Sequence, residues 1–249
     1  MLAKTLFTLA AAAAAGLLPS AAAELHTRNE SFPVNYGVIA MPGASMLDIY
    51  GPLEVLYFVA GNAHISVKII TPDGKNVPVA PPMGNKYNST FTPEFVGAAS
   101  FDDDLDLDVL IVPGGAAARD TSLTYVDDYI AKVYPKLDYL ITICTGAIFP
   151  ARAGIFDGRR VTTNKNAWSL VTAHGNNVTW VAPARYVIED NIWSSSGETA
   201  GIDLMMAWVK KWHGEKLYNT IRIGAEIIVR EADDDPFTDE LGIPHQGQL

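Results

Sequence analysis

The sequence predicts an α/β fold in which a mainly parallel sheet is flanked by helices on both faces. From residue 34 onward, short runs rich in β-branched residues alternate with amphipathic helical patterns. This alternation is typical of a parallel sheet, because parallel strands need a crossover connection between them. The clearest strand, residues 108–112, contains a continuous apolar run that leads straight into Pro113-Gly114-Gly115. Such a run indicates a strand buried on both faces.

The other elements follow from the same patterns. The expected strands are β-branched or aromatic runs bounded by turn residues, and they cover residues 36–40, 65–71, 108–112, 139–143, 160–163, 178–182 and 186–193. The expected helices have apolar residues at helical spacing, and they cover residues 47–59, 125–134, 168–173, 198–212 and 217–229. Residues 75–95 combine short extended pieces with Pro-rich turns, which indicates a hairpin excursion.

The two ends of the chain differ from this pattern. Residues 1–23 have a positive start at Lys4, an apolar run and then small residues, the order of a secretory signal peptide. An uncleaved anchor or an organelle leader is the alternative, although the apolar run is short for a membrane span. We expect residues 24–230 to form one α/β domain and residues 231–249 to form a loose acidic tail.

Three glycosylation sequons follow the predicted signal peptide, at Asn29, Asn88 and Asn177. Each triplet alone is weak, but three of them behind a signal peptide favour passage through a eukaryotic secretory pathway. The sequence therefore predicts a secreted or lumenal glycoprotein.

Composition and charge narrow the class of partner. The chain has 249 residues, of which 49% are hydrophobic and 18% charged, and these values exclude a disordered chain. A net charge of −10 disfavours nucleic acid and anionic membranes as partners. No later apolar run approaches the ~18 residues of a membrane span. We expect a small-molecule substrate and no membrane contact after signal cleavage.

No metal or cofactor is expected. The five histidines lack close paired spacing, and there is no second cysteine to complete a metal site. Pro113-Gly114-Gly115 is too short for a phosphate loop or a dinucleotide fingerprint.

Cys144 is the single cysteine, so it is either a small core residue or a reactive thiol. It lies where a strand gives way to a helix, and residues 43–48 and 113–115 also follow strands. The carboxyl ends of parallel strands meet at one edge of a sheet, where ligands bind. Unpaired N–H groups at the helix start favour a thiolate, and the N–H groups of Thr145 and Gly115 would stabilise negative charge on a substrate. We predict a nucleophile.

Five segments in this order resemble the ThiJ/PfpI superfamily, a branch of the class I glutamine-amidotransferase-like fold, over most of the chain. They are residues 48–55, 111–115, 143–147, 153–163 and 195–203. The pattern is most similar to the isonitrile hydratase branch and to the ligand-binding domains of AraC-type regulators. The resemblance implies a flavodoxin-like sandwich, in which homodimers are common.

The resemblance also implies roles for individual residues. Cys144 matches the nucleophile, Asp48 the acid beside it and Thr145 the third functional residue. Gly115, together with Gly114, matches the backbone anion-binding position. Without the resemblance, Asp48 would be interpreted as a helix N-cap. Enclosed beside the cysteine, its pKa should rise, so that it delivers a proton near neutral pH.

The chain departs from the family pattern in two places. Asn164 and Lys165 stand where many members have a histidine, so a Cys–His dyad is not expected. Thr145 replaces the histidine of protease-like members, so peptidase activity is not expected either. The leading hypothesis is a cofactor-free hydro-lyase that hydrates an isonitrile through Cys144 and Asp48. The alternatives are a glutathione-independent glyoxalase-like enzyme and a non-enzymatic ligand-binding or redox-responsive protein.

Overall fold

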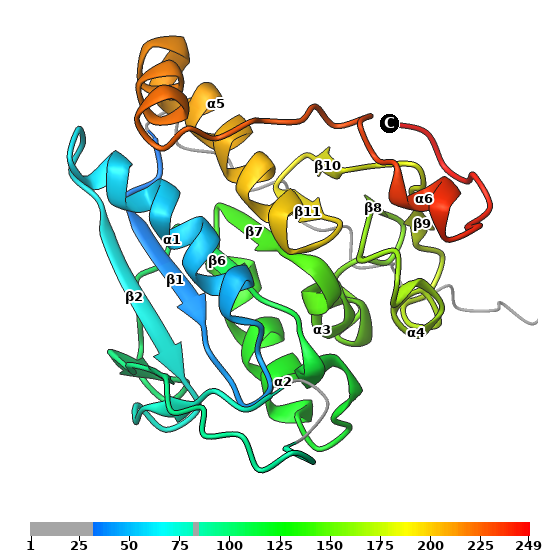
Figure 1. Cartoon of the computed structure of the whole chain (residues 1–249). Helices are drawn as coiled ribbons and strands as arrows, with labels where there is room; N and C mark the ends of the chain where they lie inside the picture. Colours follow the sequence, from blue (N-terminus) through cyan, green and yellow to red (C-terminus); the bar gives the residue numbers. More distant parts are fainter. Residues whose placement is uncertain (1–31, 82–84) are drawn as a thin grey trace, which may run out of the picture.

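The computed structural model describes residues 32–81 and 85–249. The predicted signal peptide, residues 1–23, and the sequon at Asn29 lie outside the described residues. A twisted seven-stranded sheet forms the centre of the molecule (Figure 1).

The sheet is parallel except at one edge. Its strands are β1 (Asn35–Ile39), β2 (Ser66–Thr71), β5 (Ala99–Ser100), β6 (Val109–Val112), β7 (Tyr139–Thr142), β10 (Tyr186–Glu189) and β11 (Ile192–Ser195). They lie in the order β10-β11-β7-β6-β1-β2-β5, and only β10 and β11 pair antiparallel. Every residue of β6 and β7 is buried, as expected for central parallel strands covered on both sides.

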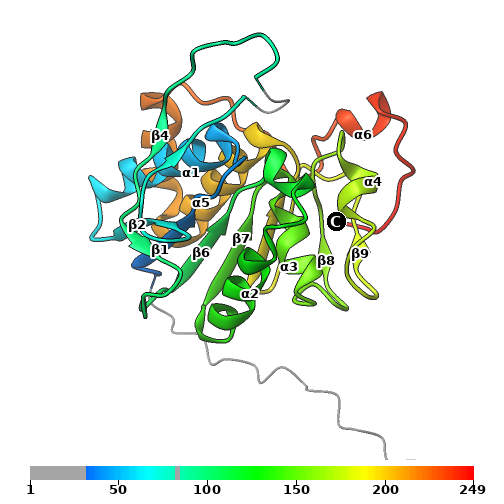
Figure 2. The same cartoon turned by 90° about the horizontal axis from the view of Figure 1, so that it is seen from below.

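Helices cover both faces of this sheet, which confirms the predicted fold class. On one face, α1 (Met46–Ala60) packs against α5 (Glu198–Gly224). On the other face lie α2 (Thr124–Val133) and α3 (Ile148–Arg152) (Figures 1 and 2). The buried indole of Trp208, a residue of α5, donates a hydrogen bond of 3.1 Å to the Tyr36 hydroxyl of β1.

The remaining elements are short. They are β3 (Val77–Pro78), β4 (Glu94–Phe95), β8 (Arg160–Val161), β9 (Thr179–Trp180), α4 (Trp168–Val171), α6 (Phe237–Glu240) and the 3-10 turns η1 (Ala116–Arg119), η2 (Tyr134–Lys136) and η3 (Cys144–Ala147). Strands β3 and β4 pair antiparallel, which confirms the predicted hairpin excursion. The described residues between them, 79–81 and 85–93, form an arm that stands out from the body (Figure 2).

One predicted strand was wrong in outline, and one predicted helix ends earlier than expected. The single strand expected over residues 186–193 is a hairpin, because the chain turns at Asp190, where φ is +57°. The helix expected over residues 217–229 is present as the second helical segment of α5, separated from the first by non-helical backbone at Gly214, where φ is +80°, but it ends at Gly224. A glycine adopts this left-handed conformation without the steric cost of a Cβ atom.

The expectation of a loose C-terminal tail was also wrong. The Asp235 carboxylate lies 3.2 Å from the Lys165 ammonium group, and both side chains are 1% exposed. The same carboxylate accepts hydrogen bonds from the Ala184 backbone N–H and the buried Thr238 hydroxyl. A buried lysine is costly without a counter-charge, and the tail supplies this charge. Residues 235–238 are therefore packed parts of the structure.

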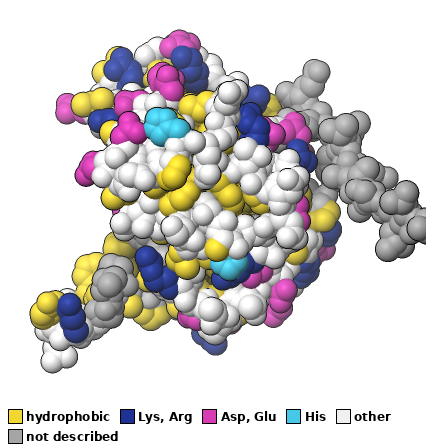
Figure 3. All heavy atoms as spheres, turned by 90° about the vertical axis from the view of Figure 1, so that its right-hand side faces the viewer, with side chains coloured by type: hydrophobic (Ala, Val, Ile, Leu, Met, Phe, Trp, Pro, Cys, Tyr) yellow, Lys and Arg dark blue, Asp and Glu magenta, His cyan; other side chains and the backbone are white. Residues whose placement is uncertain are grey.

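The surface carries charges of both signs. On the face that bears α6, acidic and basic side chains are scattered among exposed hydrophobic ones (Figure 3). Within residues 32–81 and 85–249, no helix is both long and apolar enough to cross a membrane. The sequon residues Asn88 and Asn177 are both exposed.

The buried ion pair predicts a large difference between two neighbouring aspartates. Asp235→Asn leaves the Lys165 ammonium group buried without its counter-charge and should lower the free energy of unfolding by about 3–5 kcal/mol. Asp234→Asn is the matched control, because Asp234 is half exposed in its ion pair with Arg230, and it should change stability by less than about 1 kcal/mol. Urea unfolding of both variants measures this difference. Equal stabilities would show that the tail does not anchor the domain.

Candidate functional site

The site lies at the carboxyl edge of the sheet, where the loops after β1, β6 and β7 meet. The Gly114 backbone N–H donates a hydrogen bond of 2.8 Å to Asp48 Oδ2. The Gly115 N–H donates one of 2.8 Å to Thr145 Oγ1, next to Cys144. The structure therefore brings together all five of the chemical site residues predicted from the sequence.

Two glycines allow this close meeting. A Cβ atom on Gly114 would lie 2.5 Å from the Gly146 backbone nitrogen. A Cβ atom on Gly146 would lie 2.4 Å from the Val112 carbonyl oxygen. Both distances are too short for any side chain at these two positions, so the loop after β6 and the turn after β7 approach each other backbone to backbone.

Cys144 opens the turn η3 in an unusual backbone conformation. Its φ angle is +58°, in the left-handed region that residues with a Cβ atom seldom adopt. The side chain is buried, with 5% of the residue exposed. The Cys144 carbonyl accepts a 2.8 Å hydrogen bond from the Thr163 hydroxyl, and its sulfur accepts one of 3.3 Å from the Asn164 amide. These contacts hold the strained turn in place.

Asp48 lies inside the first turn of α1, beyond the N-cap residue Ser45, and it does not cap the helix. It is fully buried, and its Oδ1 has no hydrogen-bond partner among the described residues. Burial raises the pKa of this carboxyl group to about 7, against the lowering effect of the Gly114 N–H, and the Glu198 charge raises it further. Asp48 therefore exchanges a proton near neutral pH.

The thiol of Cys144 differs from the sequence-based expectation. Burial and the neighbouring Asp48 carboxylate raise the thiol pKa above its ordinary value. The Thr145 backbone N–H and the Asn164 amide lower it by less than this. This direction disfavours the predicted thiolate, because η3 is one 3-10 turn around an enclosed sulfur, where desolvation outweighs the backbone dipoles. The raised pKa favours the thiol form of Cys144.

Asn164 also belongs to the site, although the sequence had marked it only as standing where many family members have a histidine. Its amide nitrogen donates to the Cys144 sulfur, and its Oδ1 accepts a 3.0 Å hydrogen bond from the Ala167 backbone N–H. The second contact orients the amide so that its N–H faces sulfur. An amide cannot take a proton from the thiol, so Asn164 does not replace the missing histidine as a base.

Both glycine N–H groups of the predicted anion-binding position are engaged. Gly114 binds Asp48, and Gly115 binds the Thr145 hydroxyl, which in turn donates to the Gly115 carbonyl at 3.2 Å. Anion binding at Gly115 remains a prediction, and it requires the Thr145 hydroxyl to rotate away.

A cavity of about 620 Å³ opens onto Cys144 and Thr145. The loop after β1, the arm between β3 and β4, and residues 164–167 form its walls. Its charged lining residues are Arg119, which lies outside the five family-like segments, and Glu198, which belongs to segment 195–203 but had been given no role. The volume suits a small organic molecule. Within the described parts of the chain, no group of three His, Cys, Asp or Glu side chains is placed to hold a metal ion.

The DJ-1/PfpI family model matches residues 37–211, which include Asp48, Cys144 and Asn164. The chain belongs to the DJ-1/PfpI family. One curated relative is the isonitrile hydratase of Pseudomonas putida, which is 28% identical over 195 residues, covering 76% of this chain and 77% of the relative.

Solved structures of similar fold include further DJ-1/PfpI relatives. An AraC family transcriptional regulator from Pseudomonas putida has a TM-score of 0.64 at 19% identity, covering 78% of this chain and 100% of that one. Drosophila melanogaster DJ-1beta has a TM-score of 0.60 at 18% identity, covering 80% of this chain and 99% of that one. At these identities the likeness shows the fold.

The raised thiol pKa predicts how Cys144 reacts with iodoacetamide. Labelling should be slow at neutral pH and accelerate as the solution becomes alkaline, because the thiolate is the reactive form. Asp48→Asn removes the carboxylate that raises the thiol pKa and should speed labelling at pH 8 several-fold. Glu54→Gln, an exposed change on the same helix, is the control and should leave the rate as it is. Fast labelling of the unaltered protein at pH 5 would contradict the assignment of a resting thiol.

Proposed function

We propose that this protein is a cysteine-dependent hydro-lyase that adds water to an isonitrile or a similar small electrophile. The observation that carries the proposal is the buried pair of Asp48 and Cys144, a proton-exchanging carboxyl group beside a nucleophilic sulfur. The relationship to an isonitrile hydratase supports the choice of substrate.

The first step uses one proton shared by the pair. The Asp48 carboxylate takes the thiol proton as the Cys144 sulfur attacks the terminal carbon of the isonitrile. Asp48 then returns that proton to the same carbon, where negative charge develops. The product is a thioimidate bonded to Cys144. The Asn164 N–H stabilises the charge that forms on sulfur during transfer.

The second step releases the product. Water adds to the thioimidate carbon, and the carbon–sulfur bond breaks. One proton of the water passes to the thioimidate nitrogen and the other to the Cys144 sulfur, which restores the thiol. An N-substituted formamide leaves, so that the net reaction adds one water to the isonitrile. We assign the orientation of this water to Thr145, because it lines the same cavity as Cys144.

The two alternatives have weaker support from the site. A glyoxalase-like reaction must move a proton between two carbons, and Asn164 offers no second base for this. A redox sensor needs a low thiol pKa, whereas burial raises that of Cys144. Lactate formation from methylglyoxal without glutathione would favour the first alternative.

We also infer that the enzyme is secreted or lumenal and glycosylated. The signal-like pattern of residues 1–23 and the exposure of Asn88 and Asn177 support this location. A homodimer, common among proteins of this fold, remains a proposal.

Variants of Cys144 and Asp48 test this mechanism. The measurement is the rate at which each variant converts a simple alkyl isonitrile into its formamide. Cys144→Ala removes the nucleophile and should lower kcat by about a thousandfold or more. Asp48→Asn removes the proton carrier and should lower kcat by about a hundredfold or more, although it speeds alkylation. The control Glu54→Gln should retain activity. Full activity in Cys144→Ala would exclude covalent catalysis.

The pH dependence of hydration follows from the Asp48 pKa. The active state holds one proton between Asp48 and Cys144, so activity should fall as pH drops below about 7, where both groups become protonated. Glu198→Gln removes the charge that raises the Asp48 pKa and should move this acidic limb to lower pH. Rate profiles of kcat/KM from pH 5 to 9 measure the shift, with Glu54→Gln as the reference. If kcat/KM instead rose as the pH fell below 7, the assigned direction of proton transfer, from Cys144 to Asp48, would be wrong.

A further inference from the structure

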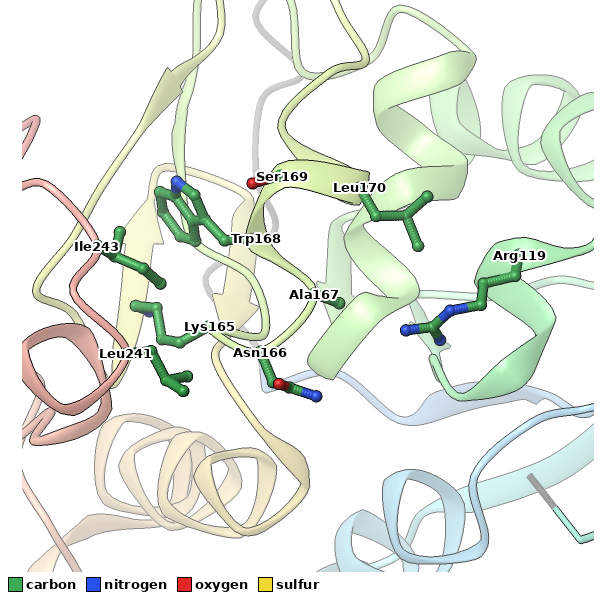
Figure 4. A pocket seen from close by; sticks show the side chains of 9 residues that line it. All are labelled: Arg119, Lys165, Asn166, Ala167, Trp168, Ser169, Leu170, Leu241 and Ile243. Carbon is green, nitrogen blue, oxygen red and sulfur yellow. The ribbon is translucent and has the colours of Figure 1, made fainter. Parts of the chain in front are cut away.

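Two adjoining cavities share one wall beside the nucleophile. The cavity of about 620 Å³ contains Cys144, and a second of about 420 Å³ extends toward Trp168 (Figure 4). Arg119, Asn166 and Ala167 line both of them. Arg119 and Cys144 therefore line the same cavity.

Arg119 is a cation without a protein partner in the described ranges. No hydrogen bond, ion pair or cation–π contact with residues 32–81 or 85–249 engages its guanidinium group. The adjacent Asp120 carboxylate is instead held by Ser122, through its backbone N–H at 2.9 Å and its hydroxyl at 2.6 Å. Figure 4 shows the guanidinium group directed across the cavity toward Asn166. Arg119 is thus free to bind a ligand.

The other charged lining residues already have partners. Glu198 accepts a 2.9 Å hydrogen bond from the Ser45 hydroxyl. Lys165, in the second cavity, is buried against Asp235. Arg119 therefore supplies the uncompensated positive charge of the shared wall, in a protein whose net charge is −10.

We propose that Arg119 binds the carboxylate of a small electrophilic substrate whose reactive carbon lies at Cys144. This inference rests on the proposed function of the cavity as a site for small electrophiles. The planar guanidinium group matches a carboxylate with two parallel hydrogen bonds. Glu198, in the same cavity, repels a carboxylate, so the two charges together select one orientation of the substrate.

Two alkylating probes of nearly equal shape test this inference. Iodoacetate is anionic and iodoacetamide is neutral, and the ratio of their rates at Cys144 cancels any general effect of a variant on the thiol. Arg119→Gln should lower the iodoacetate-to-iodoacetamide ratio about three- to fivefold, the upper end for an ion pair at an exposed site. Glu198→Gln should raise this ratio, because it removes a repelling charge.

Arg222→Gln is the matched control, because Arg222 lies near the end of α5 and lines neither cavity. It removes the same charge and should leave the ratio at the wild-type value. An unchanged ratio in Arg119→Gln, or an equal fall in Arg222→Gln, would overturn the proposal.

Isocyanoacetate and its methyl ester separate this inference from the proposed hydration. The acid should have the higher kcat/KM in the wild type, and Arg119→Gln should reduce this preference. Hydration of the ester at the same efficiency as the acid would overturn carboxylate recognition and leave hydration standing. Hydration of neither compound, with a lowered alkylation ratio in Arg119→Gln, would exclude the hydratase activity and support anion binding.

Discussion

The contact between two strand-end loops through bare backbone determines where every reacting group lies. Gly114 and Gly146 approach so closely that a methyl group on either would overlap main-chain atoms of the other loop. The Cys144 turn therefore lies directly against the loop whose N–H group holds Asp48. This single loop-to-loop contact places Asp48 and Cys144 together, although they follow different strands and are far apart in the sequence.

Much of the fold could be predicted because buried parallel strands appear in the sequence as continuous apolar runs. β6 and β7 are such runs, and both were expected within one or two residues. The hairpin of β10 and β11 was missed because its turn at Asp190 interrupts an otherwise strand-like pattern only briefly. The packed tail was missed because Asp235 is one of several consecutive acidic residues, and its partner lies far away in the sequence.

The site could be predicted in its residues but not in its electrostatics. Cys144 and Asp48 were found because each follows a strand of a parallel sheet and matches a family motif. The thiol pKa depends on how completely the sulfur is enclosed, which is a tertiary property that no local pattern contains. Asn164 and Glu198 reach the site from other parts of the chain, so their contacts with it were equally hidden.

The backbone angle of Cys144 has an evolutionary consequence. A side chain with a Cβ atom in the left-handed region costs roughly 1–3 kcal/mol, whereas glycine adopts it freely and asparagine tolerates it. A duplicated gene released from selection for activity would thus gain stability by exchanging this cysteine for glycine or asparagine. Retention of cysteine at this position in descendants of such a gene would mark continued use of the sulfur, and its loss would accompany a more stable, inactive descendant.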